Sequence, residues 1–265
     1  MTSSDLWDAG TAQRYDDDHA AMFVPAVLDP TIERLEALAA GGEGVEFAIG
    51  TGRIALPLAA RGLTVRGIEL SEPMVERLRA KPGGDALEVT IGDLATATVG
   101  EPGTASLVVL VFNTLSNLRR QDEQVAAFAN AARHLRPGGR FVVEMWLPAL
   151  QRLSGGLVVE SHGPGHHVVD EIDVVTQSVV SHHYRTEPDA GTGSDADGTA
   201  RYGSGRFRYV WPSEMDLMAR LAGMGLESRH ADWRGTPVSA AATHTVSVWR
   251  LDPDAPGGAA DAAGA

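Results

Sequence analysis

The sequence predicts an α/β fold built on a doubly wound, mostly parallel sheet, with an antiparallel β insertion in its second half. Two observations carry this prediction. Between residues 45 and 146, short apolar runs alternate with segments of helical spacing, which is typical of parallel strands connected by helices. After residue 150, strand-like segments follow one another without a helix between them, which indicates antiparallel pairing.

The bulk composition narrows the class of protein. The 265 residues, of which 43% are hydrophobic and 22% charged, suit one large globular domain better than two independent ones. The formal net charge of −13 argues against nucleic acid or an anionic membrane as a partner. No apolar run approaches the roughly 18 residues of a membrane helix and no secretory signal opens the chain, so we expect a cytoplasmic protein. The absence of cysteine excludes disulfides, thiolate metal ligands and a cysteine nucleophile.

Residues 1–40 are predicted to form an N-terminal helical cap, because apolar side chains recur at helical spacing toward its end. The core is expected over residues 41–149. Its predicted elements are, in order, a strand at 45–49, a helix at 54–61, a strand at 63–70, a helix at 71–80, strands at 86–93 and 106–112, a helix at 121–135 and a strand at 140–146. Ser71 can cap the helix that follows it. The run at 106–112 is the most apolar of the chain, which is typical of a central strand buried on both faces.

The second half of the chain is expected to face the substrate and then to close the core. The antiparallel insertion is predicted over residues 150–211, the closing elements over 212–251 and a disordered tail over 252–265, which is rich in Ala, Gly, Pro and Asp. The predicted elements are strand-like runs at 166–185 and 200–211, a helix at 212–226 that Ser213 would cap, and a strand pair at 227–233 and 244–251.

A glycine-rich turn joins the first predicted strand to the first helix of the core. Gly50, Gly52 and Ala55 match the spacing G-x-G-x-x-A, in which glycines let a ligand approach the backbone and the helix N-terminus offers free N–H groups. Glu69 ends the next strand about 20 positions after Gly50, where a carboxylate can accept both hydroxyls of a ribose. The pattern predicts a nucleoside-containing ligand, although a merely tight turn would also use these glycines.

Two further acids lie at or near the carboxyl edge of the predicted sheet, where open α/β sheets bind their ligands. Asp93 ends the third strand, so it can accept an exocyclic adenine N–H, and a turn or helix-cap role stays open for it. Glu46 lies inside the first strand, where its burial is costly without a partner. A cationic aminoacyl group or a backbone N–H would supply that partner.

In this order and spacing, the motifs resemble those of class I methyltransferases that use S-adenosylmethionine (SAM). The resemblance spans residues 40 to 251 and rests on Glu46-x-Ala48-x-Gly50-x-Gly52, Glu69-Leu70, Gly92-Asp93-Leu94 and the segments LVFNTLSNL and LRPGGRFVVEMW. It implies a Rossmann-like sheet of seven strands, mostly parallel, with the last strand antiparallel. Ala48 stands where the family usually has its first glycine, which is a mild departure because it removes little space.

The resemblance also implies a set of SAM-binding residues. Gly50 and Gly52 would line the methionine portion with their backbone, beside Ala48 and Glu46, and Glu69 would take the ribose hydroxyls. The other expected SAM-binding residues are Leu70 and Met74 against the adenine faces, Asp93 and the Leu94 N–H at the adenine edge, Phe112 and Asn113 near the aminoacyl group, and Tyr15 in an N-terminal segment that closes over SAM. For Met74, packing alone is the alternative role.

Methyl transfer mainly requires that donor and acceptor are aligned and that water is excluded. A hydroxyl or ammonium acceptor also needs a base, and histidine is the natural candidate near pH 7. We therefore name His182 and His183, in the insertion, as candidate catalytic residues. Adjacent histidines on a strand point to opposite faces, so neither this pair nor His166-His167 chelates a metal by itself, and no metal is expected.

The expected activity is methyl transfer from SAM to an O or N atom of a small molecule, with a role in secondary metabolism. The insertion resembles that of bacterial small-molecule methyltransferases, including sugar N-methyltransferases of antibiotic biosynthesis. The tetrapeptide FNTL follows the fourth strand in place of an asparagine-proline-proline-tyrosine signature, which speaks against nucleic acid as the substrate. We expect a small-molecule partner, no nucleic acid and no membrane, and leave a homodimer open.

Two alternative functions remain at this stage. A SAM-binding protein that catalyses a non-methylating reaction would keep every cofactor residue. An NAD-dependent oxidoreductase would use the same turn and Glu69, but it would more often carry a Tyr-x-x-x-Lys proton donor. Lys81, which lies near the motifs, has no tyrosine four positions before it, so this alternative is less favoured.

Overall fold

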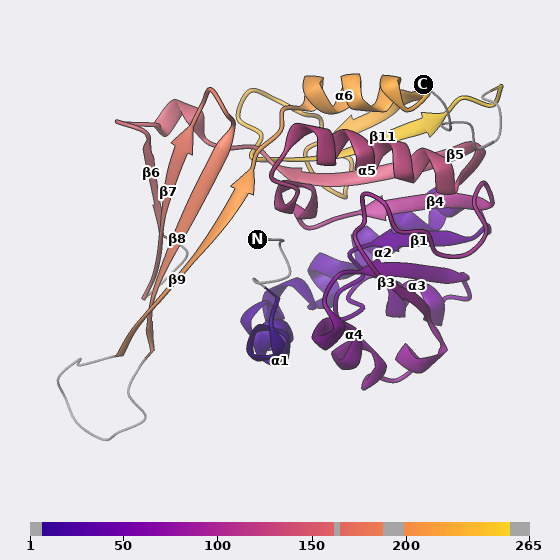
Figure 1. The fold of residues 1–265 in the computed structure, drawn as a ribbon, viewed down its shortest axis with the longest axis horizontal. Coiled ribbons are helices and arrows are strands. Elements are labelled where there is room, and N and C mark those ends of the chain that lie inside the picture. Colours follow the sequence, from indigo (N-terminus) through magenta and orange to yellow (C-terminus); the bar gives the residue numbers. More distant parts are fainter. Residues whose placement is uncertain (1–6, 162–164, 188–198, 255–265) are drawn as a thin grey trace, which may run out of the picture.

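The computed structural model describes residues 7–161, 165–187 and 199–254. Its core is a seven-stranded sheet flanked by helices, and a separate four-stranded sheet extends from one end (Figure 1). The core strands are β1 (Gly44–Phe47), β2 (Val65–Glu69), β3 (Glu88–Ile91), β4 (Ala105–Leu110), β5 (Leu135–Trp146), β10 (Met224–His230) and β11 (His244–Leu251). Their spatial order is β10-β11-β5-β4-β1-β2-β3. Strand β11 pairs antiparallel with β5 and β10, and every other pair is parallel, so the predicted fold class is confirmed.

Helices cover both faces of the core sheet. The α-helices of the described residues are α1 (Ala9–Asp18), α2 (Pro25–Ala39), α3 (Ala55–Ala60), α4 (Glu72–Arg79), α5 (Gln121–His134) and α6 (Pro212–Leu221). Buried side chains of α5 and α6 pack on one face, and those of α2, α3 and α4 pack on the other. Strand β4 lies between β1 and β5 with every residue buried, as its apolar sequence predicts.

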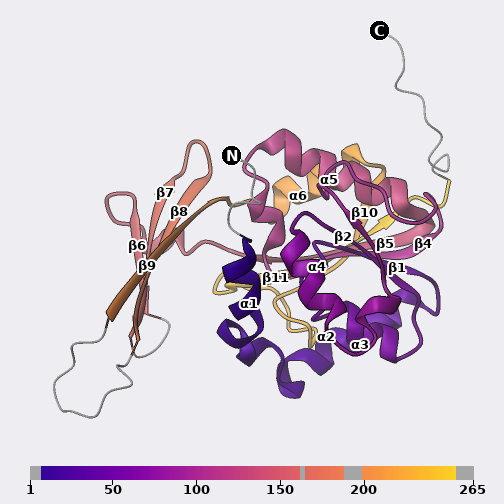
Figure 2. The ribbon, with the colours of Figure 1, turned by 60° about the horizontal axis from the view of Figure 1, so that its bottom comes forward.

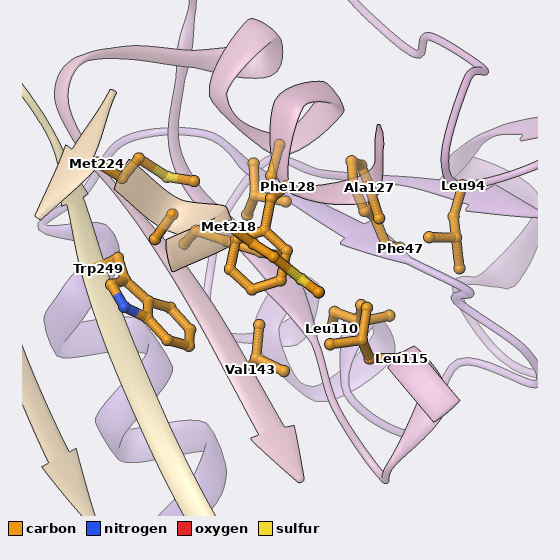
Figure 3. Packing of buried hydrophobic residues seen from close by; sticks show 14 of the residues in the cluster. Phe47, Leu94, Leu110, Leu115, Ala127, Phe128, Val143, Met218, Met224 and Trp249 are labelled. Carbon is orange, nitrogen blue, oxygen red and sulfur yellow. The ribbon is translucent and has the colours of Figure 1, made fainter. Parts of the chain in front are cut away.

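Aromatic side chains bring α5, β5 and β11 together in the core (Figure 3). Phe128 of α5 makes edge-to-face contacts with Phe141 and Trp249, at ring-centroid distances of 5.1 and 5.4 Å. Such pairs contribute about 0.5–1.5 kcal/mol each beyond the burial of their area. The Trp249 indole N–H also donates to Asp216 Oδ1 at 2.9 Å, which fixes α6 over the last strand.

The insertion forms the four-stranded sheet. Its strands β6 (Leu157–Ser161), β7 (His166–Asp173), β8 (Ser178–Glu187) and β9 (Thr199–Arg208) pair antiparallel in chain order. A partly buried ion pair joins this sheet to the core, because Arg208 Nη2 donates to Glu214 Oε1 of α6 at 2.7 Å. The same Nη2 donates to Gln177 Oε1, within the insertion, at 2.9 Å. In both ribbon views α1 lies between the small sheet and the core (Figure 2).

Some elements differ from the sequence prediction. Helix α1 carries no apolar stripe that periodicity could detect, since Ala12 is its one buried residue, and Asp8 marks its start by accepting from the Thr11 N–H at 2.7 Å. The cap predicted at Ser213 is wrong, because Trp211 occupies the N-cap position of α6, without a side-chain hydrogen bond, and Ser213 lies inside the first turn. From residue 255 onward the predicted tail lies outside the described residues. Within the described segments, every helix is too short or too polar to cross a bilayer.

Gly52 is required by packing between helices. Its φ of +84° lies in the left-handed region, and a Cβ placed on it would come within 2.2 Å of Leu78 Cδ1 in α4. Leu78 is fully buried and belongs to the core beneath α2 and α3. A side chain at position 52 would therefore strain the backbone and displace the buried side chain of Leu78.

We expect Gly52→Ala to lower the free energy of unfolding by about 2 kcal/mol or more, since left-handed strain adds to overpacking. Gly44→Ala in β1 is the matched control, because a Cβ there meets no atom within 4 Å. Its cost should stay below about 1 kcal/mol. Urea unfolding measures both variants, and equal effects would contradict the packing role of Gly52.

Candidate active site

The candidate donor site consists of two adjoining cavities, of about 60 and 40 Å³, at the carboxyl ends of β1, β2 and β3. Most of the expected SAM-binding residues line one or both of them: Tyr15, Ala48, Gly50, Glu69, Leu70, Met74, Asp93 and Leu94. Among the lining residues that the sequence analysis missed are Trp7, Thr114 and Asn117. The last two belong to the quoted segment LVFNTLSNL, so the signal for them lay in the motif itself.

Glu69 joins the end of β2 to the glycine turn. Its Oε2 accepts from the Gly50 N–H and its Oε1 accepts from the Ser71 N–H, both at 2.9 Å. Burial raises the pKa of Glu69, while these backbone N–H groups lower it. A carboxylate oxygen has two lone pairs, so each oxygen can accept one more hydrogen bond from a ligand hydroxyl in the cavity.

The structure separates the roles of the two glycines. Gly50 has φ +56°, and a Cβ on it would meet only the Ala48 carbonyl oxygen, at 3.9 Å. It lines the first cavity, so its backbone is open to a ligand. Gly52 instead faces Leu78. Ala48 has φ 54°, a conformation that costs a non-glycine residue about 1–2 kcal/mol. Alanine in place of the family's usual glycine therefore adds backbone strain as well as a methyl group.

Glu46 is a buried acid with one unsatisfied oxygen. Its side chain is 3% exposed, the Ala55 backbone N–H bonds to its carboxyl group, and Oε2 has no hydrogen-bond partner. Burial raises the pKa of Glu46 to about 8, against the opposing effect of the Arg53 guanidinium. The side chain is therefore mostly neutral at pH 7 and is suited to a cationic partner. The sequence leaves a backbone N–H and a cation as partners of Glu46, and the carboxyl group has an oxygen for each of them.

Asp93 takes part in a turn and also lines a donor cavity. Its Oδ1 accepts from the Ala95 N–H at 2.8 Å, which is turn chemistry, and the residue also lines the second cavity beside Leu94 and Leu70. Met74 is 3% exposed and lines the first cavity, so it too both packs and faces the site.

Helix α1 covers the donor cavities and is tied to the glycine turn. Thr51 Oγ1 donates to Asp16 Oδ1 at 2.6 Å, and Lys81 Nζ lies 2.5 Å from Asp16 Oδ2 and 2.8 Å from the Thr51 carbonyl oxygen. Tyr15 lines the first cavity and packs against His19, with ring centroids 4.5 Å apart. Burial raises the pKa of Tyr15 to about 12, so its hydroxyl stays protonated at neutral pH.

A larger cavity, of about 230 Å³, lies between the core and the small sheet. The core contributes Asn113, Ser116 and Trp146, and the insertion contributes Val168, Asp170, Val179, Ser181, His183, Phe207 and Tyr209. Asn113 therefore faces this cavity rather than the donor cavities. Its neighbour Phe112 packs against His19 and Arg53, with its ring centroid 5.4 Å from the His19 ring and 5.2 Å from Arg53 Cζ.

The two candidate catalytic histidines lie on opposite faces of the small sheet. His183 lines the larger cavity, where its Nε2 is 3.2 Å from Ser181 Oγ and its Nδ1 is 3.1 Å from His166 Nε2. His182 is outside the cavity, with its Nδ1 2.7 Å from the Tyr202 hydroxyl. Across the described residues, no group of three or more His, Asp or Glu side chains is arranged to hold a metal ion.

Comparison with known proteins identifies the family. The family described as "Methyltransferase domain" matches residues 45–139. The solved structure of the CcbJ methyltransferase from Streptomyces caelestis is 36% identical in sequence, with a TM-score of 0.74, and the match covers 85% of this chain and 89% of that chain. This chain belongs to the class I SAM-dependent methyltransferases. Its cofactor is SAM, and family membership favours neither the NAD-dependent oxidoreductase nor the non-methylating alternative.

Curated relatives agree with this assignment. The cypemycin N-terminal methyltransferase from Streptomyces sp is 26% identical to this methyltransferase over 199 residues, which are 74% of this chain and 78% of the relative. The dTDP-3-amino-3,4,6-trideoxy-alpha-D-glucopyranose N,N-dimethyltransferase from Streptomyces venezuelae is 38% identical over 80 residues, which are 30% of this chain and 32% of the relative.

Two observations on this methyltransferase fit SAM. The open space over Gly50 leaves its backbone accessible, and Glu46 Oε2 lacks a partner that an α-ammonium group would supply. Binding of that cation favours the ionised carboxyl, whereas the free protein holds it mostly protonated below pH 8. SAM binding at pH 7 should therefore release a proton.

We expect the affinity for SAM to rise with pH between pH 6 and 7.5, by up to about tenfold per pH unit, because the cost of deprotonating Glu46 falls. Glu46→Gln should weaken binding and flatten this dependence. Calorimetry in two buffers of different ionisation enthalpy measures both the affinity and the released proton. An equally steep dependence in Glu46→Gln would contradict the pairing.

Proposed function

We propose that this methyltransferase moves a methyl group from SAM to a nitrogen atom of a small molecule of secondary metabolism. The observation that carries the choice of nitrogen over oxygen is Asp170, which is 6% exposed and lines the larger cavity. A buried carboxylate favours a cationic ligand, and the aromatic walls supplied by Trp146, Phe207 and Tyr209 favour one too. A neutral hydroxyl acceptor gains less from these groups.

The names of the relatives support an amine acceptor. The curated relative from Streptomyces venezuelae is named for an amino sugar, and the cypemycin enzyme is named an N-terminal methyltransferase. The acidic net charge of −13 supports a small molecule rather than nucleic acid as the partner. We further propose a cytoplasmic location and a homodimer as the form to test first.

The donor half would work by binding and orientation. Glu69 would accept the ribose hydroxyls, Asp93 and the Leu94 N–H would take the adenine edge, and Leu70 and Met74 would pack on the adenine faces. Gly50 and Ala48 would line the methionine portion, with Glu46 near its ammonium group and Tyr15 excluding water. Phe112 and Asn113 would meet the junction between donor and acceptor. When bound, SAM supplies an electrophilic methyl group on a sulfonium.

The insertion, residues 150–211, would hold the acceptor against the core over 41–149, with residues 1–40 as a cap and 212–251 closing the fold. An ammonium acceptor must lose a proton before its nitrogen can attack. His183 is suited to take it, because it lines both the larger cavity and a neighbouring cleft. Its contact with His166 offers a route for the proton away from the acceptor.

The test of the proposed function uses isotopically labelled SAM and a panel of paired metabolites, each amine matched by the alcohol of the same scaffold. We expect S-adenosylhomocysteine and labelled N-methyl products from a subset of the amines, detected by mass spectrometry. Asp170→Asn should raise the KM for the amine, because the negative charge of the carboxylate is lost. Methylation of the alcohols in preference to their amine partners would contradict the assignment to nitrogen.

His183→Ala should lower kcat by about 100-fold, the lower range for loss of a general base, with unchanged affinity for SAM. His182→Ala is the matched control, because its ring lies on the other face of β8 and should leave kcat near that of the parent protein. Initial rates with an accepted amine and calorimetry with SAM measure the two quantities. Equal rates in both variants would remove His183 from the mechanism.

A further inference from the structure

The segment that follows β4 holds two consecutive residues in an uncommon conformation. Phe112 and Asn113 have φ values of 57° and 58°, in the left-handed region. Asparagine tolerates this region, but a bulky aromatic residue rarely adopts it. Such a conformation persists only where neighbouring groups fix it, and it often occurs at functional sites.

This segment forms the wall between the donor cavities and the larger cavity. Thr114 and Asn117 line the donor side. Asn113 and Ser116 line the larger cavity. A short 3-10 helix, Thr114–Asn117, carries residues of both sets, so they move together. The position of this wall therefore decides how the two cavities are placed relative to each other.

Glu144 of β5 holds the start of this wall with two hydrogen bonds and accepts a third from Trp233. Its Oε2 accepts from the Phe112 N–H at 2.8 Å, and its carbonyl oxygen accepts from the Asn113 N–H at 3.2 Å. Its Oε1 accepts from the indole N–H of Trp233 at 2.7 Å. Asn113 Oδ1 in turn accepts from the Trp146 N–H at 3.1 Å, which ties the wall to the end of β5.

Trp233 fixes the direction of the Glu144 carboxylate. It lies in the connection between β10 and β11, and its ring packs against the core cluster that contains α2 and α3. The same connection is tied to α2, since Arg234 Nη2 donates to the Ala26 carbonyl oxygen at 2.8 Å. A carboxylate held at one oxygen by a packed indole can present the other oxygen to Phe112 in one orientation.

A displacement of Phe112 would directly disturb the glycine turn. Its ring lies against Arg53, which follows Gly52 in the turn, and against His19 at the end of α1. The wall, the turn and α1 are thus in contact through one side chain whose backbone depends on Glu144.

We infer that Glu144 and Trp233 are positioning residues for methyl transfer, which hold Phe112 and Asn113 in their left-handed conformation and so set the wall of the donor pocket. The inference rests on SAM binding, which family membership establishes, and not on the nature of the acceptor. It is therefore tested with SAM alone, and its failure would leave the proposed amine acceptor untouched.

The experiment measures amide hydrogen exchange over residues 107–118 and the affinity for SAM by calorimetry. Glu144→Ala should speed exchange at the amides of Phe112 and Asn113 and weaken SAM binding by about tenfold, the effect of losing hydrogen bonds to a charged group. Glu227→Ala is the matched control. It removes a carboxylate that pairs with Arg140, which lies on β5 as Glu144 does, and within the described residues Glu227 makes no bond to the wall.

A rescue separates this role from a general loss of stability. Glutamine has a single carbonyl oxygen, so Glu144→Gln leaves its NH₂ facing one of two N–H donors. Adding Trp233→Phe removes the indole donor and frees the amide oxygen for Phe112. The double variant should therefore recover both amide protection and SAM affinity relative to Glu144→Gln.

Three results would overturn the inference: unchanged exchange in Glu144→Ala, faster exchange with unchanged SAM affinity, or faster exchange spread equally over α5 and the wall. A double variant that binds SAM more weakly than Glu144→Gln would overturn it as well.

Discussion

The candidate donor site depends on one carboxylate that binds two backbone N–H groups. Glu69 links the end of β2 to Gly50 in the turn after β1 and to Ser71 at the start of α4. Neighbouring parallel strands end at the same edge of the sheet, and this side chain fixes the relative position of the segments that leave two of them. Glu69 also lines both donor cavities, so the residue that orders these segments is also available to a ligand.

The candidate site places a buried, mostly protonated acid next to a strained turn. Glu46 is held mostly protonated by burial, next to a turn in which Ala48 and Gly50 are both left-handed. A cationic ligand group would satisfy the acid and lie over the open backbone. Recognition of such a ligand would therefore involve a buried acid and a strained turn, which are typical of functional sites.

The fold and most of the donor site were predictable because they follow from local patterns. The alternation of strands and helices fixes which strand ends meet at the ligand edge, and Glu69 and Asp93 lie at those ends. The different roles of Gly50 and Gly52 were not predictable, since they depend on the contact with Leu78 from α4. Strand alternation places His182 and His183 on opposite faces, but only the docking of the small sheet determines which face lies toward the core.

The larger cavity draws its lining unequally from the two sheets. Asn113, Ser116 and Trp146 come from the core, and the remaining residues come from the insertion. Mutations in the insertion can therefore reshape this cavity while the strand ends that carry Glu69 and Glu46 stay intact. Such a division lets descendants of one ancestral gene diverge in what they modify while they inherit an unaltered cofactor-binding half.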